Sequence, residues 1–444
     1  MMDVSESNGR KTVLFAMYDG GGNVSPLLAV AEELLARGHR VIVLGGPFFG
    51  ESKTSKSLTE RASALGCEIR EMTVDDERAP NVPRQRGLFA GRTGRWFGPL
   101  QFTHSIHQGS WRWAQCVAEL CRKDDIDVVA ADDMLPGAMV GAESAGIPYC
   151  SLLHTVYFFR PAPGLPPPGM GMDPPVNIAH RIRDHVIKRS MSRVYIRDAL
   201  PSLNAARSRV DLEPIQHPWE QHARAKHVIV LTSKYFDFKS SRLPQNVVYA
   251  GMPFARGAVA RAQRDYPEER PTVLISLSTS DLEQTATAQA ALDALAPLPV
   301  KSIITLTGGL SANRLKLPPN AEPMGFVPHF DLMPNISAVV THGGHGTVLT
   351  ALSHGKPIVC TPIYFDQFDI ARRVKHSGAG VDVGRRHSVE AIRVAVQRVL
   401  SESTFTARAQ AMAENLSIES GRERAASIIE SAAIGVDPDE LLAN

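Results

Sequence analysis

The chain has 444 residues, of which 43% are hydrophobic and 21% charged, as in ordinary globular proteins. Its 48 Lys and Arg nearly balance 46 Asp and Glu, so the charge gives no reason to expect nucleic acid or an anionic membrane surface as a partner. Residues 1–12 lack the apolar segment of a signal peptide, no apolar run is long enough to span a membrane, and the five cysteines include no CxxC pair. We therefore expect a cytoplasmic protein of two or three domains with reduced thiols.

The first part of the chain alternates between strand and helix patterns. The apolar run at 12–18 predicts a buried strand, residues 25–39 have helical periodicity, and residues 40–46 predict the next strand. The pattern returns at 125–133 and continues in a strand-like segment at 150–158. Such alternation indicates a parallel sheet with helices on both faces.

Two stretches fit this scheme poorly. Residues 78–110 mix Pro, Arg, Gly and aromatic residues without a period, and residues 160–175 form a proline-rich loop. Long irregular insertions on an α/β scaffold are more often binding loops than spacers. A segment rich in Pro and charge follows at 243–271 and is typical of a linker, after which the alternation restarts at 272–280.

The most informative stretch is 339–380. A buried strand ends at His342, a glycine turn follows, and a helix begins near Thr347, so its N-terminal amides and dipole suit a phosphate or diphosphate. About twenty residues later a second strand ends before Asp366 and Gln367, which can hydrogen-bond sugar hydroxyls. Both segments lie at the carboxyl ends of strands, where open α/β sheets bind ligands.

This stretch resembles the donor-binding signature of family 1 glycosyltransferases of the GT-B fold, which are UDP-glycosyltransferase-like, and its pattern is most similar to the bacterial members that act on antibiotics and macrolides. The family pattern is HGGxGT, followed by GxPxxxxP and DQ. The matching residues are His342, Gly343, Gly344, His345 at the free position, Gly346, Thr347, Gly355, Pro357, Pro362, Asp366 and Gln367.

The resemblance implies two Rossmann-like domains that face each other across a cleft, with a C-terminal helix that can cross back to the N-terminal domain. We expect an acceptor domain at 1–242, a linker at 243–271, a nucleotide-sugar domain at 272–420 and a helical tail at 421–444. The implied reaction is inverting transfer from a UDP- or dTDP-sugar to a hydrophobic or aromatic natural product, without a cofactor or metal. The oligomeric state stays open, with a homodimer as one alternative.

Further donor contacts follow from the same resemblance. Phe326 would pack on the nucleobase, the backbone at Val327 would read its edge, and Ser278 and Thr279 would lie near the phosphates or the sugar. Gly22 in the opening glycine turn is a further candidate donor contact. Thr350 stands where many UDP-sugar enzymes carry a Glu that holds both ribose hydroxyls. Because dTDP has no 2′-hydroxyl, Thr350 favours a dTDP-sugar slightly, and UDP stays an alternative.

The opening segment, with Gly22 in its glycine turn, resembles the start of the family's N-terminal domain, but His or Asp normally stands where this chain has Asn23. That residue takes the acceptor's proton, and an amide is not basic. Asp132, fourteen residues before Gly146, matches the Asp that orients the family's His. Three hypotheses follow. Asp132 or Asp133 is the base, or the acceptor is acidic enough that Asn23 only positions it, or a loop residue supplies the base, with these candidates: His104, His107 and His154.

Other interpretations stay open beside these. Asp132 and Asp133 can be ordinary polar residues at a strand end. Trp96 and Phe97 can line an acceptor pocket, or belong to the core with Trp111 and Trp113. The triplet at 125–127 matches a metal-binding DxD, which arises easily by chance, and the opening loop lacks the third glycine of a dinucleotide-binding GxGxxG. Asn23 also leaves open a protein of another class, a degenerate nucleotide-sugar-binding partner of an active enzyme.

Overall fold

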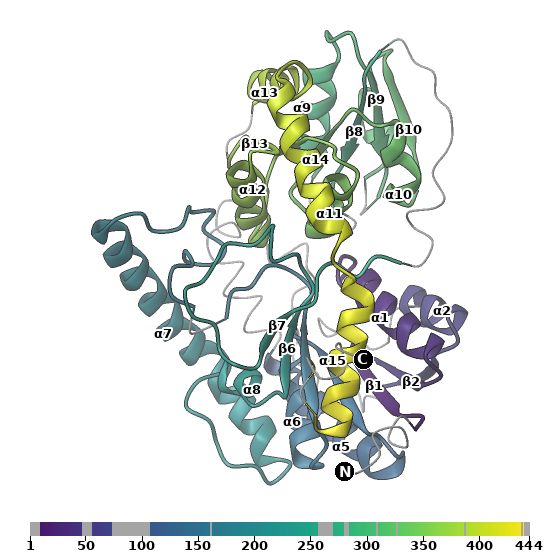
Figure 1. Cartoon of the computed structure of the whole chain (residues 1–444), viewed down its shortest axis with the longest axis vertical. Coiled ribbons are helices and arrows are strands. Elements are labelled where there is room, and N and C mark those ends of the chain that lie inside the picture. Colours follow the sequence, from purple (N-terminus) through teal and green to yellow (C-terminus); the bar gives the residue numbers. More distant parts are fainter. Residues whose placement is uncertain are drawn as a thin grey trace.

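The structure is a computed structural model in which the chain forms two parallel sheets, each covered by helices (Figure 1). It describes these residues: 9–46, 56–72, 107–159, 162–255, 270–278, 284–307, 310–325, 327–385, 388–436 and 438. In this part of the chain, no helix combines the length and the apolar character that crossing a lipid bilayer requires.

The first sheet has seven strands in the order β3-β2-β1-β4-β5-β6-β7, and every pairing is parallel. Its strands are β1 (Thr12–Met17), β2 (Arg40–Gly45), β3 (Glu68–Glu71), β4 (Val128–Asp132), β5 (Tyr149–Leu153), β6 (His227–Val230) and β7 (Val247–Tyr249). Its helices are α1 (Val24–Ala36), α2 (Lys56–Ala64), α5 (Ser110–Lys123), α6 (Pro136–Ser144), α7 (Ile178–Ser208) and α8 (Glu220–Ala223). The expected linker at 243–271 therefore begins with a short strand, because its apolar residues pair with β6.

The second sheet has six strands in the order β10-β9-β8-β11-β12-β13, again all parallel. Its strands are β8 (Thr272–Ser276), β9 (Lys301–Thr305), β10 (Ala321–Met324), β11 (Ala338–Thr341), β12 (Ile358–Cys360) and β13 (Gly380–Asp382). Its helices are α9 (Thr285–Leu295), η3 (Ala312–Arg314), α10 (His329–Leu332), η4 (Met333–Asn335), α11 (His345–Ser353), α12 (Asp366–Ser377), α13 (Val389–Ser401) and α14 (Ser403–Ser417). The expected pair of Rossmann-like domains is confirmed.

Apolar residues of the central strands are buried on both faces, which explains why these runs do not alternate with polar residues. In β1, Val13 and Phe15 pack into one hydrophobic core, and Leu14 and Ala16 pack into another on the opposite face. Successive side chains of a strand point to opposite faces, so a run that is apolar throughout suits a sheet covered by helices on both sides.

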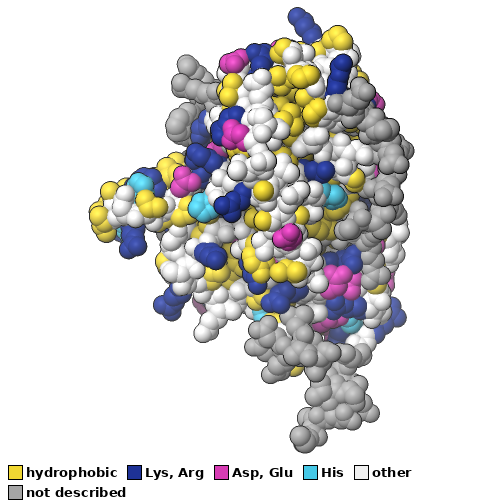
Figure 2. Space-filling model, turned by 45° about the horizontal axis from the view of Figure 1, so that its top comes forward, with side chains coloured by type: hydrophobic (Ala, Val, Ile, Leu, Met, Phe, Trp, Pro, Cys, Tyr) yellow, Lys and Arg dark blue, Asp and Glu magenta, His cyan; other side chains and the backbone are white. Residues whose placement is uncertain are grey.

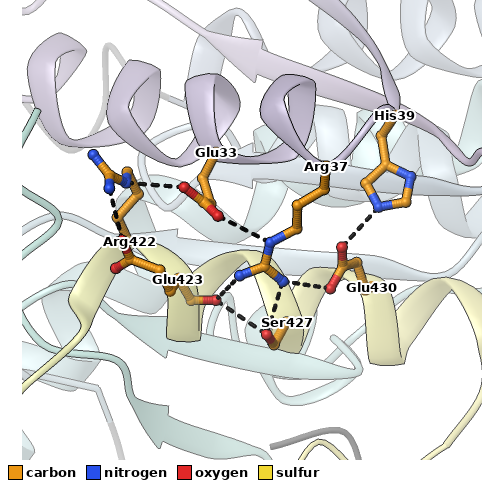
Figure 3. A network of polar contacts seen from close by, with 7 residues as sticks. All are labelled: Glu33, Arg37, His39, Arg422, Glu423, Ser427 and Glu430. Carbon is orange, nitrogen blue, oxygen red and sulfur yellow. Dashed lines mark hydrogen bonds and ion pairs between the residues drawn. The ribbon is translucent and has the colours of Figure 1, made fainter. Parts of the chain in front are cut away.

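The last helix, α15 (Gly421–Ile434), crosses back and packs against the first domain beside α1 (Figure 1). Charged groups join the two helices (Figure 3). Arg37, which follows α1, binds Glu430 at 2.7 Å, and His39 contacts the other oxygen of that carboxylate at 2.7 Å. Arg422 binds Glu33 at 3.1 Å. The expected return of the C-terminal helix to the N-terminal domain is confirmed.

Each sheet reverses its strand order next to its first strand, between β1 and β4 in one domain and between β8 and β11 in the other. Ligands of open parallel sheets bind at the carboxyl ends of strands at such points. On the face shown in Figure 2, basic and acidic side chains are interspersed, and hydrophobic ones gather on the projecting part. The projecting helix α7 exposes Ile178, Ile182 and Val186 near its N-terminal end.

Candidate active site

His342 stands directly after β11, and the loop from Gly343 leads into α11 two residues later. No side chain caps the N-terminus of α11, so its first amides are available to an anion. Burial lowers the pKa of His342 to about 4, and the side chain is therefore neutral at pH 7. A neutral imidazole donates one N–H, which suits a phosphoryl oxygen.

The two signature segments touch each other at Gly343. This residue has a φ of +86°, and a Cβ added to it would lie 2.9 Å from the carbonyl oxygen of Gln367. The Gln367 side chain in turn holds the loop before α12, because its Oε1 accepts from the amides of Ile363 and Tyr364, both at 2.9 Å. Gln367 therefore shapes this loop, and its oxygen is already engaged by backbone.

Asp366 and His345 lie at the boundary between the two domains. Thr155, which follows β5 of the first domain, donates to Asp366 Oδ2 at 3.4 Å. His345 Nε2 lies 2.7 Å from Thr232 Oγ1 of the first domain, and burial lowers the pKa of this imidazole to about 3. The His at the free position of the signature therefore contacts the neighbouring domain through a neutral hydrogen bond.

Some of the remaining donor candidates lie near the end of β8, and others lie elsewhere. Ser278 is buried, and its amide donates to Gln284 Oε1 at 2.8 Å. Thr347 Oγ1 lies 3.4 Å from His329 Nδ1, and His329 Nε2 lies 2.9 Å from Ser276 Oγ. Gly346 and Gly344 belong to the same turn and helix start, Val327 packs against the core of the second domain, and Gly22 is exposed. Thr279 and Phe326 lie outside the described residues.

Sequence reasoning did not single out His329. The sequence offered a clue to this residue, because His329 stands two positions after Val327, a predicted donor contact. It joins the ends of β8 and α11, and burial lowers its pKa to about 4.

Asn23 is 2% exposed and makes three hydrogen bonds. Its Oδ1 accepts from the amide of Gly20 at 3.0 Å, and its Nδ2 donates to Tyr18 O at 2.9 Å and to Asp132 Oδ2 at 2.8 Å. These partners fix the orientation of the Asn23 amide. If the amide were rotated by 180°, its oxygen would face two acceptors, Tyr18 O and Asp132 Oδ2. Both N–H groups of the Asn23 amide already donate hydrogen bonds within the protein. The side chain therefore holds the glycine loop in place and has no donor left for a bound sugar-acceptor molecule.

Asp132 is fully buried, and both of its oxygens are engaged. Oδ1 accepts from the Met134 amide at 2.9 Å, and Oδ2 accepts from Asn23. Burial raises the pKa of Asp132 to about 6, although the nearby His154 partly opposes this. Asp132 is thus held away from the cleft, and the hypothesis that it meets the acceptor directly receives no geometric support.

His154 follows β5 and lies beside both carboxylates. Its Nδ1 is 3.1 Å from Asp133 Oδ1 and 3.8 Å from Asp132 Oδ2, and its side chain is 20% exposed. Burial disfavours the imidazolium, but Asp132, Asp133 and Asp366 outweigh this effect and raise the pKa of His154 to about 9. Asn23, Asp132, Asp133 and His154, all candidates from sequence, are therefore brought together.

The same three titratable groups could hold a divalent cation, because ligand atoms of Asp132, Asp133 and His154 lie within 4.8 Å of one another. No residue pattern predicted this group. A cation there would have to displace the proton of the imidazole and share an oxygen that Asn23 already occupies. The arrangement therefore suits an imidazolium better than a metal ion.

A pocket of about 900 Å³ lies next to this cluster, with Asp133 in its wall. Residues of both domains line it, including Phe365, Asp369 and Arg373 from the segment that carries Asp366. Most of its lining side chains are apolar, and six of them are aromatic residues: Tyr157, Phe158, Phe159, Tyr195, Trp219 and Phe365. The proline-rich loop contributes Pro163, Leu165, Pro166 and Pro168, in keeping with a binding loop.

Polar groups also line this pocket, among them His107 and His222. His107 is buried and its Nε2 lies 3.3 Å from the hydroxyl of Tyr195. Burial lowers the pKa of His222 to about 4, a shift that Asp133 opposes and His107 reinforces, so these groups lie near one another. His107 is therefore a pocket residue, as the sequence suggested, while Trp96, Phe97 and His104 lie outside the described residues. Trp113 belongs to the core.

A buried ion pair joins the domains beside the pocket. Arg373 on α12 donates to Asp237 Oδ1 at 2.7 Å, and the other oxygen of Asp237 accepts from the amide of Tyr157 at 2.8 Å. One turn earlier, Asp369 accepts from the amides of Gly169 and Gly171 at 2.6 and 2.9 Å. The helix that begins with Asp366 is thus anchored to the loop that lines the pocket.

Comparison with known proteins agrees with this arrangement. Residues 289–430 match the family model described as erythromycin biosynthesis protein CIII-like, C-terminal domain. The chain is 29% identical over 432 residues to 4′-demethylrebeccamycin synthase of Lentzea aerocolonigenes, covering 94% of this chain and 98% of that protein. It is 25% identical over 435 residues to demethyllactenocin mycarosyltransferase of Streptomyces fradiae, covering 94% and 86%.

Solved structures show the same fold. The glycotransferase of kitacinnamycin superposes with a TM-score of 0.72 at 19% identity, covering 95% of this chain and 99% of that one. The calicheamicin glycosyltransferase CalG4 superposes with a TM-score of 0.68 at 20% identity, covering 95% and 98%. The chain has the fold of GT-B glycosyltransferases, and together with its glycosyltransferase relatives this supports a nucleotide-sugar-dependent glycosyltransferase.

Proposed function

We propose that the chain transfers a sugar from a dTDP- or UDP-sugar to a large hydrophobic, mainly aromatic small molecule, with inversion at the anomeric carbon. One observation carries the proposal. The aromatic pocket shares a wall with the donor segment, because Phe365 lines the pocket and the next residue is Asp366. An acceptor in this pocket would meet a sugar held by Asp366, and an aromatic wall suits a flat aromatic acceptor.

The donor's diphosphate would lie between His342 and the first amides of α11. Neutral His342 would donate to one oxygen, and the helix N-terminus would stabilise the charge of the departing nucleoside diphosphate. Thr350 is buried on α11, where it offers no carboxylate to a ribose diol. This favours dTDP, and the described complexes of VinC with dTDP and SsfS6 with thymidine diphosphate support it. The relatives named UDP-glycosyltransferase 2 and UDP-glucosyltransferase avaP keep UDP as the alternative.

Inversion is the outcome that this geometry favours. The acceptor would approach from the first domain while the leaving group is held by the second, so attack and departure occur on opposite faces of the sugar. Holding the acceptor on one side of the sugar and the leaving nucleoside diphosphate on the other supplies much of the rate enhancement, through proximity and electrostatic stabilisation. The chain's own pocket and signature loop provide both.

A panel of nucleotides tests the donor half of the proposal. We expect dTDP and UDP to raise the melting temperature of the purified protein, and GDP to do so less. His342→Gln should reduce the shift, whereas the matched control His180→Gln, on the projecting part of α7, should keep it. If none of the nucleotides stabilises the wild-type protein, the proposal is wrong.

A transfer assay tests the acceptor half. The protein is incubated with dTDP-glucose or UDP-glucose and with fused aromatic phenols and indoles, and products are detected by mass spectrometry. The coupling constant of the product's anomeric proton then reports the configuration. An α-linked product from these α-linked donors would contradict inversion.

A further inference from the structure

The carboxyl ends of β4 and β5 place an acid and an imidazole side by side. The strands pair in parallel register, with Asp132 opposite Leu152, so Asp133 and His154 both follow the strand ends at the same edge of the sheet. His154 Nδ1 lies 3.1 Å from Asp133 Oδ1, and because both atoms are buried without a hydrogen bond of regular geometry, the contact is that of an ion pair. The exposed fifth of the His154 side chain therefore lies elsewhere on the ring, toward Nε2 and the carbons.

Asn23 explains why the imidazole sits here. In the position where the resemblance predicts a basic residue, this chain has an amide that occupies Asp132 Oδ2. Each oxygen of Asp132 already accepts a hydrogen bond, from Asn23 and from the Met134 amide, and His154 lies nearer to Asp133, 3.1 Å away compared with 3.8 Å to Asp132. The acid–imidazole pair thus lies between the ends of β4 and β5, whereas the resemblance predicts it between the loop after β1 and the end of β4.

His154 also lies beside the place where the two substrates would meet, although the pocket wall contains its partner Asp133 and not His154 itself. Thr155, the residue after His154, hydrogen-bonds Asp366 of the donor segment at 3.4 Å. The charged groups that face His154 are Asp132 and Asp133 from the end of β4 and Asp366 from α12, while His345 from α11 is neutral.

We propose that His154 is the base that accepts the acceptor's proton, and that Asp133 is the positioning residue that holds its ring. This rests on the proposed transfer to a small-molecule acceptor. The acceptor's lone pair forms a bond to the anomeric carbon while the bond from that carbon to the diphosphate oxygen breaks, its electron pair leaving with the nucleoside diphosphate. The acceptor's proton moves to Nε2 of neutral His154, whose Nδ1–H faces the Asp133 carboxylate, and the proton later passes to water.

The three carboxylates around the ring give this base a signature. They raise the pKa of His154 to about 9, so at pH 7 only a small fraction is neutral and able to act. The transfer rate should therefore rise with pH from 7 toward 9. A nearby negative charge stabilises an imidazolium, so removing Asp133 should lower the pKa of His154 and move this rise to lower pH.

The test compares His154→Gln, Asp133→Asn and the control His180→Gln, using dTDP-glucose and UDP-glucose with the phenol and indole panel. We expect His154→Gln to lower kcat for transfer about 100- to 1,000-fold, in the range of a lost general base, and to flatten the pH profile. Asp133→Asn should lower the plateau rate and shift the midpoint of the pH rise to lower pH. All three variants should keep the stabilisation by nucleotides.

Two results would overturn the proposal. One is a His154→Gln variant that keeps the wild-type rate and pH profile, and the other is an Asp133→Asn variant that loses activity with its midpoint unchanged. Loss of nucleotide stabilisation in His154→Gln would also count against it, because the residue would then serve donor binding. Failure of the proposed function looks different, since the wild-type protein itself would neither bind nucleotides nor consume a donor.

Discussion

Asn23→Asp tests whether Asn23 is a structural residue that fastens the glycine loop to β4. The substitution keeps the shape of the side chain and removes both donors, leaving Tyr18 O and Asp132 Oδ2 without them. Each buried acceptor that loses its partner costs about 1–3 kcal/mol, so we expect a loss of about 2–6 kcal/mol at neutral pH. Two carboxylates in contact would add to this. The loss is large beside a typical stability of about 5–15 kcal/mol.

Urea unfolding followed by circular dichroism and fluorescence measures this loss in the first domain's transition, because two-domain proteins can unfold in separate steps. The loss should shrink as the pH falls from 8 toward 5. Burial already raises the pKa of Asp132 to about 6, and a second carboxylate raises the pKa further. The native state then binds a proton that the unfolded state lacks, so acid favours folding over this window.

The double variant Asn23→Asp with Asp132→Asn provides the control. It restores a hydrogen bond between the two side chains, with the new amide at position 132 as donor, but it does not restore the donor that Asn23 gives to Tyr18 O. We expect it to recover about half of the loss, roughly 1–3 kcal/mol. A single variant as stable as the wild type, or a double variant less stable than the single one, would refute the assignment of Asn23 as a structural donor.

Three further predictions concern the domain boundary, the signature turn and metal dependence. Arg373→Gln leaves the buried Asp237 carboxylate without its positive partner, although the Tyr157 amide still donates to it, so the substitution should cost about 3–5 kcal/mol in urea unfolding. Arg373→Gln with Asp237→Asn should cost less; equal losses would contradict the pairing. Gly343 has a positive φ, and a Cβ there would lie 2.9 Å from Gln367 O, so Gly343→Ala should lower both the melting temperature and the nucleotide affinity. Gly109→Ala is the matched control and should lower neither, because a Cβ at Gly109 meets nothing within 4 Å. Transfer should persist in excess EDTA, and a rate restored only by added Mg²⁺ or Mn²⁺ would show that the acidic cluster holds a metal.

Much of the fold and the donor site could be predicted from sequence because both depend on local patterns. Short apolar runs between helical segments identify buried parallel strands, and the strand ends of β8, β11 and β12 carry the signature residues. His342 and Gly343 need only the chain immediately around them to form the turn. The strand that the sequence predicts to end at His342 ends one residue earlier, since β11 spans Ala338–Thr341.

The acceptor side depends on contacts between distant residues, which local patterns do not report. The helix α7 is nearly as hydrophobic on one side as on the other, so its sequence does not show which face lines a pocket. It nevertheless supplies Tyr195 to the pocket. The contacts of His345 with Thr232 and of Arg373 with Asp237 require the relative placement of two sheets. The pairing of His154 with Asp133 could have been found from sequence by noting polar residues at the ends of two neighbouring strands.

The most direct test of the account is a crystal structure of the protein with dTDP or UDP bound. We expect the diphosphate to lie within hydrogen-bond distance of His342 and the first amides of α11. The pocket beside Asp133 and Phe365 should then be free to bind the acceptor. A diphosphate bound instead at the glycine loop that Asn23 closes would contradict the assignment of the donor and acceptor sides.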